Sequence, residues 1–505
     1  MREIFAIVKK TTKITLWVLG VLFGLGVLVV TSADVAVSRI AEKQARAAIE
    51  VAQLPYTIEF DHIHVLLMSG CVELEDIHFG ASGKALKNNQ IDTVDIKVPN
   101  VAFRMISYKD LIKHRKLSVN SLKVRKACAK MKGKGTKLSV EADSLTVELR
   151  HLYYCLADST YGYCDSLYDV SLSRLQFTNA RGLIKIEAND LKTEDGGPIF
   201  LGNTRIWNSV AKRELANILK EPSTWIDLKL NSVEVSPLNL LRTDFTKGLT
   251  LDKITVKAKH LDVFRDNRLK PTKPFPMPQT VIAGMSYPLR IKRVEFMMPK
   301  LDVGVLMTDK NLGQLQVTNI QMVARDFSTK RGNVLKANLT AELGTGKFDG
   351  VFRLHNDKEC NFDLDLQGRE VETSCLTGML RPIVAMELDC HVDSLKAKYS
   401  GNSENITGTV MLAYHGMKGR VFKGEDIPIR IVQQNAGAIE YFVNHLIPKS
   451  NPRNDSKAPL EFNVDVKRDE MKPFPLYALT PLIMGAVETF LPGLFQGKKV
   501  KKTKE

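Results

Sequence analysis

This chain of 505 residues has few cysteines and none of the common catalytic signatures. Its seven cysteines are spread thinly and never form the C-x-x-C pair of a zinc or thioredoxin-like site. The G-x-S-x-G turn of serine hydrolases, the phosphate loop of nucleotide-binding enzymes and the H-E-x-x-H zinc pair are all missing. His62 and His64 share one face of a predicted strand, but no carboxylate or cysteine completes a metal-ligand set, which favours solvent-facing residues. We therefore expect no enzyme, no metal and no cofactor.

Charge is missing from residues 14–30, ITLWVLGVLFGLGVLVV. Extended through residue 33 at about 1.5 Å per residue, this run approaches the roughly 30 Å of a bilayer's hydrocarbon core. Lys9, Lys10 and Lys13 precede it, and basic flanks stay on the cytoplasmic side. The sequence thus predicts a cytoplasmic tail (1–13), one membrane-spanning helix (14–33) and a remainder outside the cytoplasm. The anchoring side chains are Leu16, Trp17, Leu19, Leu22, Phe23, Leu25 and Leu28.

A cleaved signal peptide is the alternative for this segment, because the small residues Thr31 and Ala33 precede Asp34. The apolar run is longer than the ~7–15-residue core of a signal peptide, and no helix breaker follows it. From residue 35 to 49 apolar residues recur at helical spacing instead, so we expect a helical neck over residues 34–54 that Pro55 ends.

The overall composition is that of a folded, basic protein. Hydrophobic residues make up 44% and charged residues 25% of the chain, which excludes wholesale disorder, and the formal net charge is +16. Such an excess suits nucleic acid, an anionic membrane surface or solubility alone. The predicted topology argues against nucleic acid as a partner. The lysines of residues 498–504 form a basic tail that either faces anionic lipid headgroups or is a solvated end.

An eight-residue pattern, apolar-x-apolar-x-x-apolar-x-apolar, is the main feature of the remaining chain. Each half alternates with period two and so places its apolar side chains on one face of a strand. The doubled polar pair would send the two halves to opposite faces unless a β-bulge or bend absorbs one residue. We therefore predict bends near Asp61/His62, Asn120/Ser121 and their equivalents. The octets span 58–65, 72–79, 117–124, 170–177, 228–235, 249–256, 289–296 and 315–322.

Alternating runs between the octets complete a mainly β chain. We predict a long curled antiparallel sheet with a few short helices, among them 106–116 and 208–222. The sheet is divided into a first region (55–268) and a second region (280–470). The Pro-rich stretch 269–279 between them is either a linker or an excursion from one sheet.

The end of the chain is apolar. Residues 436–448 read as a helix that Pro448 stops, and residues 471–505 hold a second apolar segment (474–497) and the basic tail. Proline and glutamate interrupt the second segment, which favours a helix docked on the sheet or lying at a membrane interface over a second span. Cys155 and Cys164 bracket a turn-like segment and either pair across a hairpin or remain free thiols.

The N-terminal arrangement resembles the AsmA-like family of bacterial envelope proteins. The resemblance rests on the anchor with its following helix and on two segments, IEFDHIHVLLMSGCVELEDIHFG at 58–80 and IDTVDIKVPNVAFRMISYKDLIKHRKLSVNSLKVRKACAKM at 91–131. It covers roughly residues 10–130. It implies a curled sheet with an apolar groove, anchored in the inner membrane with its bulk in the periplasm. It also implies a role in moving phospholipid between membranes or in outer-membrane homeostasis.

The apolar positions of the octets are the side chains expected to line such a groove. An apolar concave face must be filled by the protein's own packing or by acyl chains. The candidates are Ile58, Phe60, Ile63, Val65, Val72, Leu74, Leu117, Val119, Leu122, Val124, Leu228, Leu230, Leu249, Leu251, Ile254 and Val256.

Two functions follow from these features as hypotheses. In the first, the protein binds phospholipid or another acyl-chain lipid and conducts it between membranes, or supports outer-membrane assembly. In the second, the same sheet is a structural or assembly factor that binds envelope proteins through exposed strand edges without lipid. An anchored enzyme acting on an envelope polymer is a third, weaker hypothesis, because no catalytic site is recognisable.

Overall fold

The computed structural model describes residues 34–52, 54, 56–67, 69–82, 90–155, 161–162, 168–238, 247–285, 287–308, 310–422, 448–452 and 458–490. The predicted tail and spanning helix, most of the helix predicted at 436–448, and the basic C-terminal tail lie outside these residues. Among the helices that the structure does describe, none is long and apolar enough to cross a membrane.

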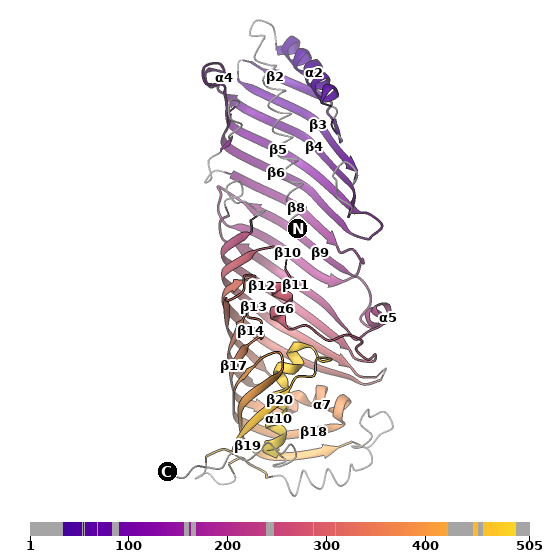
Figure 1. Ribbon diagram of the computed structural model, residues 1–505, viewed down its shortest axis with the longest axis vertical. Helices are drawn as coiled ribbons and strands as arrows, with labels where there is room; N and C mark the ends of the chain where they lie inside the picture. Colours follow the sequence, from indigo (N-terminus) through magenta and orange to yellow (C-terminus); the bar gives the residue numbers. More distant parts are fainter. Residues whose placement is uncertain are drawn as a thin grey trace. The chain divides into compact units, whose positions relative to one another are not determined.

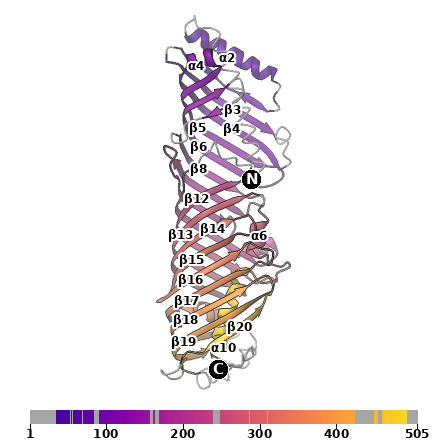
Figure 2. The same ribbon diagram turned by 60° about the vertical axis from the view of Figure 1, so that its left-hand side comes forward.

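The described residues fold into two compact units that are built mainly from antiparallel strands (Figures 1 and 2). The N-terminal unit comprises Met1–Ser209 and Leu230–Leu249, and the C-terminal unit comprises Val210–Lys229 and Thr250–Glu505. Strand β11 (Ser223–Val235) contains one of the divisions. The mainly β architecture with few short helices agrees with the prediction from the sequence.

The described residues of the N-terminal unit form one antiparallel sheet with two helices. Strands β1 and β2 both pair with β3, strands β3 to β6 pair in sequence order, β7 and β8 both pair with β6, and β8 to β10 again pair in sequence order. Its elements are α2 (Asp34–Val51), β1 (Thr57–Glu59), β2 (His62–Leu66), β3 (Cys71–Ser82), β4 (Ile91–Ile106), α4 (Tyr108–His114), β5 (Lys116–Gly133), β6 (Ser139–Cys155), β7 (Tyr161–Gly162), β8 (Tyr168–Thr178), β9 (Ile184–Thr193) and β10 (Ile199–Asn208).

The C-terminal unit is also built on an antiparallel sheet, in which β13 to β20 pair in sequence order. Strand β12 lies beside β13, and Lys253 of β12 forms an ion pair of 2.8 Å with Glu295 of β13. The elements are α5 (Glu214–Leu219), β12 (Leu249–Asp266), α6 (Pro278–Ala283), β13 (Leu289–Leu306), β14 (Leu312–Ser328), β15 (Val334–Leu343), β16 (Gly346–His355), β17 (Phe362–Glu372), η1 (Thr373–Leu376), α7 (Thr377–Val384), β18 (Met386–Gly401), β19 (Asn405–Val421), β20 (Glu461–Lys467) and α10 (Phe474–Phe490).

Several octets bend at their central polar pair, as the phase shift predicts. In the first octet, β1 ends at Glu59 and β2 begins at His62. In the octet of β3, Asp76 adopts a left-handed backbone with φ of 50°. Leu74 and Ile77, on either side of Asp76, pack in the same core cluster. The bend therefore absorbs the extra residue and keeps both halves of the octet on one face.

In the octet of β5 the left-handed residues lie on the neighbouring strands and not at the predicted pair. The register places Met105 of β4 and His151 of β6 opposite Asn120, and their φ angles are 53° and 54°. The octet of β8 has the same arrangement, with Ser144 and Asp190 opposite its middle residue. A bend continues across hydrogen-bonded neighbours, so a neighbouring strand can carry the left-handed residue. The bend predicted near Asn120/Ser121 therefore lies in this row, with its left-handed residues on β4 and β6.

The Pro-rich stretch 269–279 packs inside the C-terminal unit. The backbone N–H of Phe275 donates to the carbonyl of Glu470 (2.8 Å), and the Arg468 guanidinium donates to the carbonyl of Phe275 (2.5 Å). Met277 is buried in the core cluster of this unit. The stretch is therefore an excursion and not a free linker, because apolar residues between its prolines give it core contacts. The division between the units falls earlier, between Ser209 and Thr250.

Candidate functional site: the apolar inner faces

Apolar side chains of the N-terminal unit line up across neighbouring strands on one face of the sheet. Val124 of β5 lies opposite Val147 of β6, which lies opposite Val170 of β8. Parallel rows run from Ala142 through Leu175 to Ala188 and from Val140 through Phe177 to Ile186. Because directly opposed residues in an antiparallel pair project to the same side, these rows form one continuous apolar surface. We call it the inner face.

The other face of the same strands is charged and paired. Lys123 and Glu148 form an ion pair of 2.8 Å, and Arg150 reaches Asp169 at 2.8 Å. Arg174 bonds to Asp143 in the same way. These residues alternate with the apolar rows along each strand, as a sheet with one wetted face requires.

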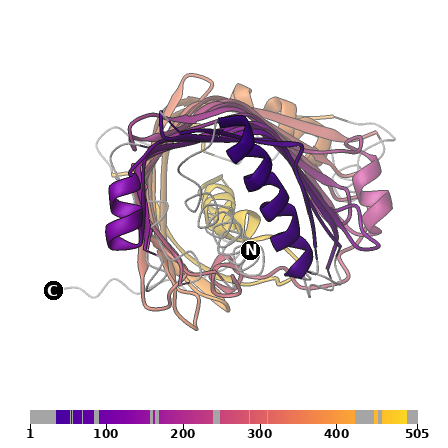
Figure 3. The ribbon, with the colours of Figure 1, turned by 90° about the horizontal axis from the view of Figure 1, so that it is seen from above.

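Helix α2 covers part of the inner face. Its buried side chains Val37, Ala41 and Ala45 belong to one core cluster with residues of β2 to β5. Figure 3 shows α2 on the concave side of the curved strands of this unit. The small alanines let the helix lie close to the sheet. This end of the inner face is therefore filled by the protein itself.

Most groove candidates from β1 to β5 are part of this filled end. Ile58 is half-buried on β1, whereas the other nine candidates between residues 60 and 124 pack in the core cluster that includes α2. They share a face, as predicted, but they line a closed core. Leu230 and Leu251 are buried on β11 and β12, and Leu228, Leu249, Ile254 and Val256 are half-buried there.

Further along the sheet, the inner face lies uncovered among the described residues. Val140, Val147, Leu149, Leu175, Phe177 and Ile186 are only half-buried. The two described helices of this unit, α2 and α4, pack mainly on β2 and β5. Strands β6 to β9 therefore expose Val, Leu, Ile and Phe side chains that a closed domain would bury.

In the C-terminal unit, α10 packs on the apolar face of the last strands, which we call the inner face of this unit. Tyr477 is buried against Phe362, with ring centroids 6.2 Å apart, and Phe474 meets Phe362 edge-on at 5.1 Å. The Tyr399 hydroxyl donates to the carbonyl of Ala478 at 2.5 Å. Burial raises the pKa of Tyr399 strongly and that of Tyr477 to about 12, so both remain neutral donors.

The opposite side of α10 is apolar and uncovered. Leu476, Leu479 and Ile483 are 41%, 49% and 55% exposed, although they lie on a helix inside the curved sheet. An ordinary docked helix presents polar residues on its free side. Helix α10 therefore fills part of the inner face and presents a new apolar surface in its place.

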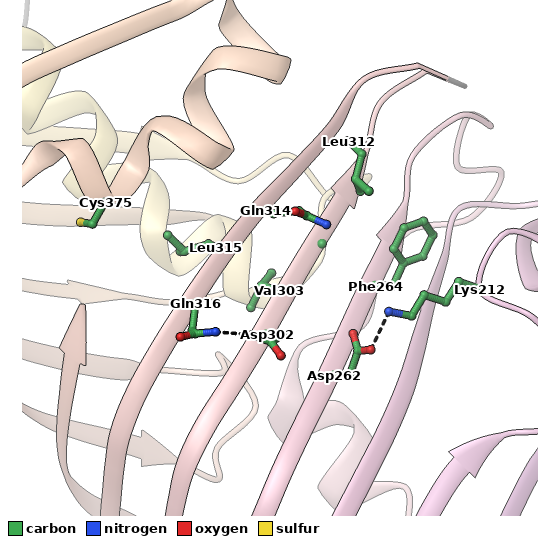
Figure 4. A pocket seen from close by; sticks show the side chains of 11 residues that line it. Lys212, Asp262, Phe264, Asp302, Val303, Leu312, Gln314, Leu315, Gln316 and Cys375 are labelled. Carbon is green, nitrogen blue, oxygen red and sulfur yellow. Dashed lines mark hydrogen bonds and ion pairs between the residues drawn. The ribbon is translucent and has the colours of Figure 1, made fainter. Parts of the chain in front are cut away.

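A pocket of about 420 Å³ in the C-terminal unit is lined by residues of β12, β13 and β14 together with Lys212 and Cys375 (Figure 4). Its charges are paired: Lys212 contacts Asp262 at 2.5 Å, and Gln316 donates to Asp302 at 2.9 Å. Burial raises the pKa of Asp302, but hydrogen bonds from Gln316 and the nearby His260 and Lys300 outweigh burial and keep it below its ordinary value.

The pocket has the features of a structural polar network and not of a catalytic centre. Burial raises the pKa of the Cys375 thiol, which disfavours a nucleophilic thiolate. No group of three or more His, Cys, Asp or Glu suited to a metal ion occurs within the described part of the chain. His62 and His64 are exposed on β2, where His64 lies 3.4 Å from Glu75.

Two features of the site had little signal in the sequence. The residues of α10 are apolar on all sides, so periodicity could not identify the side that packs on the sheet. Helix α2 covers the edge of β2 through hydrogen bonds made by single polar residues, and no periodic pattern in the sequence predicts these bonds. Cys155 ends β6, and Cys164 lies outside the described residues, so their disulfide stays a prediction.

Comparison with protein-family models and with curated proteins gives no match for this chain.

Proposed function

We propose that this protein is a membrane-anchored envelope protein that binds phospholipid acyl chains on the inner faces of its sheets and conducts lipid between membranes or supports outer-membrane assembly. The observation that carries the proposal is the uncovered apolar surface of β6 to β9, opposite a face of paired charges. The AsmA-like resemblance and an anchor in the inner membrane, with the bulk of the chain in the periplasm, belong to the same proposal.

The apolar inner face suits contact with acyl chains, and the charged outer face suits contact with water. Acyl chains on the apolar rows would remove Val, Leu and Phe side chains from water, at about 25 cal/mol for each Å² of apolar area. The charged outer face stays solvated. The exposed Leu476, Leu479 and Ile483 of α10 extend the same kind of surface in the C-terminal unit. Such a surface supplies a path for lipid but no energy, so net movement requires a gradient or a partner.

The edge-binding hypothesis has less support, because α2 satisfies the edge of β2. The N–H of Val65 donates to the Ser38 hydroxyl (2.8 Å), and the N–H of Leu67 donates to the Asp34 carboxylate (3.2 Å). The Arg46 guanidinium donates to the carbonyls of Phe60 and Asp61. An incoming strand would first have to displace these bonds.

Photocrosslinking in the full-length protein tests the proposal. The photoreactive residue p-benzoylphenylalanine replaces Phe177, on the inner face, in cells whose phospholipids carry a radioactive phosphate label. The matched control replaces Gln176, which is also half-buried but projects to the outer face, where it bonds to Glu187 at 3.0 Å. We expect a labelled phospholipid adduct at position 177 and none at 176.

The two competing outcomes are distinct. Equal labelling at both positions would mean that lipid contacts reflect general membrane proximity, and the proposal would fail. Protein adducts at position 177 without labelled lipid would favour the assembly-factor hypothesis.

A further inference from the structure

A second cavity, outside the inner face, lies between α2 and β2 in the N-terminal unit. Its volume is about 670 Å³, and it is lined by residues 34–46 of α2 together with His62 to Leu66 of β2. The apolar side chains in its lining include Val35 and Leu66, which are 65% and 46% exposed. Val35 and Leu66 therefore give the cavity an apolar wall beside its charged residues.

The cationic groups of the cavity are only partly neutralised. Arg46 pairs with Glu42 at 3.0 Å, and Asp34 accepts the backbone N–H of Leu67. Arg39 and Lys43 lie one turn apart on the same side of α2, and within the described residues neither has an ion-pair partner. The cavity thus combines two free cations with an apolar wall.

His62 and His64 also face the cavity, and both lie near carboxylates: His62 is 3.8 Å from Glu42, and His64 is 3.4 Å from Glu75. The two carboxylates in the lining are therefore already engaged, Asp34 by the backbone N–H of Leu67 and Glu42 by Arg46 and His62. An anion that enters meets Arg39 and Lys43 first.

We infer that the cavity between α2 and β2 binds the phosphodiester headgroup of a phospholipid, with Arg39 and Lys43 on the phosphate and Val35 and Leu66 against the upper acyl chain. This inference rests on the proposed function and names its entry site. The sequence supports the location, because the apolar run 14–30 ends only three residues before α2 begins. A headgroup site at that point would receive lipid from the membrane in which the run is anchored.

The test uses the full-length protein with p-benzoylphenylalanine at Leu66, in cells with phosphate-labelled phospholipid. The variant Arg39→Gln/Lys43→Gln removes both free charges. Each lysine or arginine at an anionic surface contributes about 1 kcal/mol, so losing two should lower the labelled adduct roughly tenfold or more. Both side chains are exposed, so the fold of α2 should persist.

The matched control is Lys109→Gln/Lys113→Gln on α4. These lysines have the same spacing, are described without ion-pair partners and belong to the same unit, but they do not line the cavity. We expect this control to retain the Leu66 adduct. An unchanged adduct in the Arg39/Lys43 variant, or an equal loss in the α4 variant, would overturn the inference.

Two further arms separate the possible failures. Glycerol 3-phosphate added to solubilised protein should not abolish the adduct, because the inference requires the acyl chain as well as the phosphate; full competition would indicate a site for soluble phosphate esters. A labelled adduct at Phe177 with none at Leu66 would reject this entry site alone, and no adduct at either position would reject the proposed function as well.

Discussion

Helix α10 can pack this closely on the sheet because Gly485 has no side chain. A Cβ atom at Gly485 would lie 2.5 Å from Cβ and 2.6 Å from Cγ1 of Val410, a residue of β19 that is fully buried. Both atoms belong to a stiff β-branched residue in the middle of a strand, so neither can move aside easily. The substitution Gly485→Ala therefore sets helix propensity against packing.

We expect the packing cost of the added methyl group to exceed the gain in helix propensity. Alanine in a helix interior is favoured over glycine by about 1 kcal/mol, whereas an extra carbon in a close-packed core costs about 1–3 kcal/mol. Contacts near 2.5 Å belong to the upper part of that range. We expect a net loss of roughly 1–2 kcal/mol in the free energy that holds α10 on the sheet, which corresponds to about 5- to 30-fold faster local opening.

Hydrogen exchange measured by mass spectrometry on peptides from residues 474–490 reports this opening directly. The control is Thr480→Ala on the same helix, outside the core cluster; it gains helix propensity and loses only the exposed hydrogen bond from the Thr480 hydroxyl to the Leu476 carbonyl (2.8 Å), so exchange should change little. Slower exchange in Gly485→Ala would refute the reasoning, because it would mean that α10 gains helix stability without meeting Val410.

Three other substitutions test the bends, the covered edge and a charged cluster. Replacing Asp76 by valine should cost about 1–2 kcal/mol of stability in the N-terminal unit, because a β-branched residue resists its left-handed backbone, whereas Asp76→Gly should be close to neutral; chemical denaturation compares the two. Ser38→Ala leaves the N–H of Val65 without its acceptor and should cost about 1–2 kcal/mol and speed exchange in β2, while an unchanged β2 would show that water replaces the hydroxyl. A hydrogen bond to Glu372, with Glu370 nearby, raises the pKa of His391, which also faces Asp393 and His415. Protonated His391 therefore stabilises the fold fully below about pH 6.5, and this stabilisation is lost as the pH rises through the raised pKa. His391→Gln should accordingly lower the melting temperature at pH 6 and have little effect at pH 9, and an equal loss at both would point to packing alone.

Local periodicity predicted the strands and their two faces. Alternation along a strand is a property of neighbouring residues, so the octets identified the side shared by Leu74, Ile77, Leu122 and Val124 without any tertiary information. The same reasoning placed α2 and α4 close to their observed bounds. Periodicity could not decide which strand of a pair carries the left-handed residue, because one bend continues across several neighbouring strands.

Closure of the inner face could not be predicted in the same way. Whether Phe60 or Val119 lines an open groove or a core depends on where a separate helix lies, and this is set by long-range packing. Ala41 and Ala45 carried the only local sign, since two small residues on the buried side of a helix allow close approach. For α10, Gly485 carried a similar sign, but a glycine in an apolar segment is equally typical of a membrane helix.

The uncovered rows of the N-terminal unit are energetically significant compared with the stability of a domain. Fully burying a Val, Leu, Ile or Phe side chain is worth about 1.5–3 kcal/mol, and the partial exposure of these side chains leaves at most about a third of that unrealised. Summed over Val140, Val147, Leu149, Leu175, Phe177 and Ile186, the unrealised term is at most about 3–6 kcal/mol. Domains are stable by only about 5–15 kcal/mol, so an apolar occupant of this face would add a sizeable fraction of the stability of a domain. Acyl chains meet this requirement without a fixed register, because dispersion and the hydrophobic effect are non-directional. Under the proposed function, acyl chains would therefore stay bound to this face and still move along the rows.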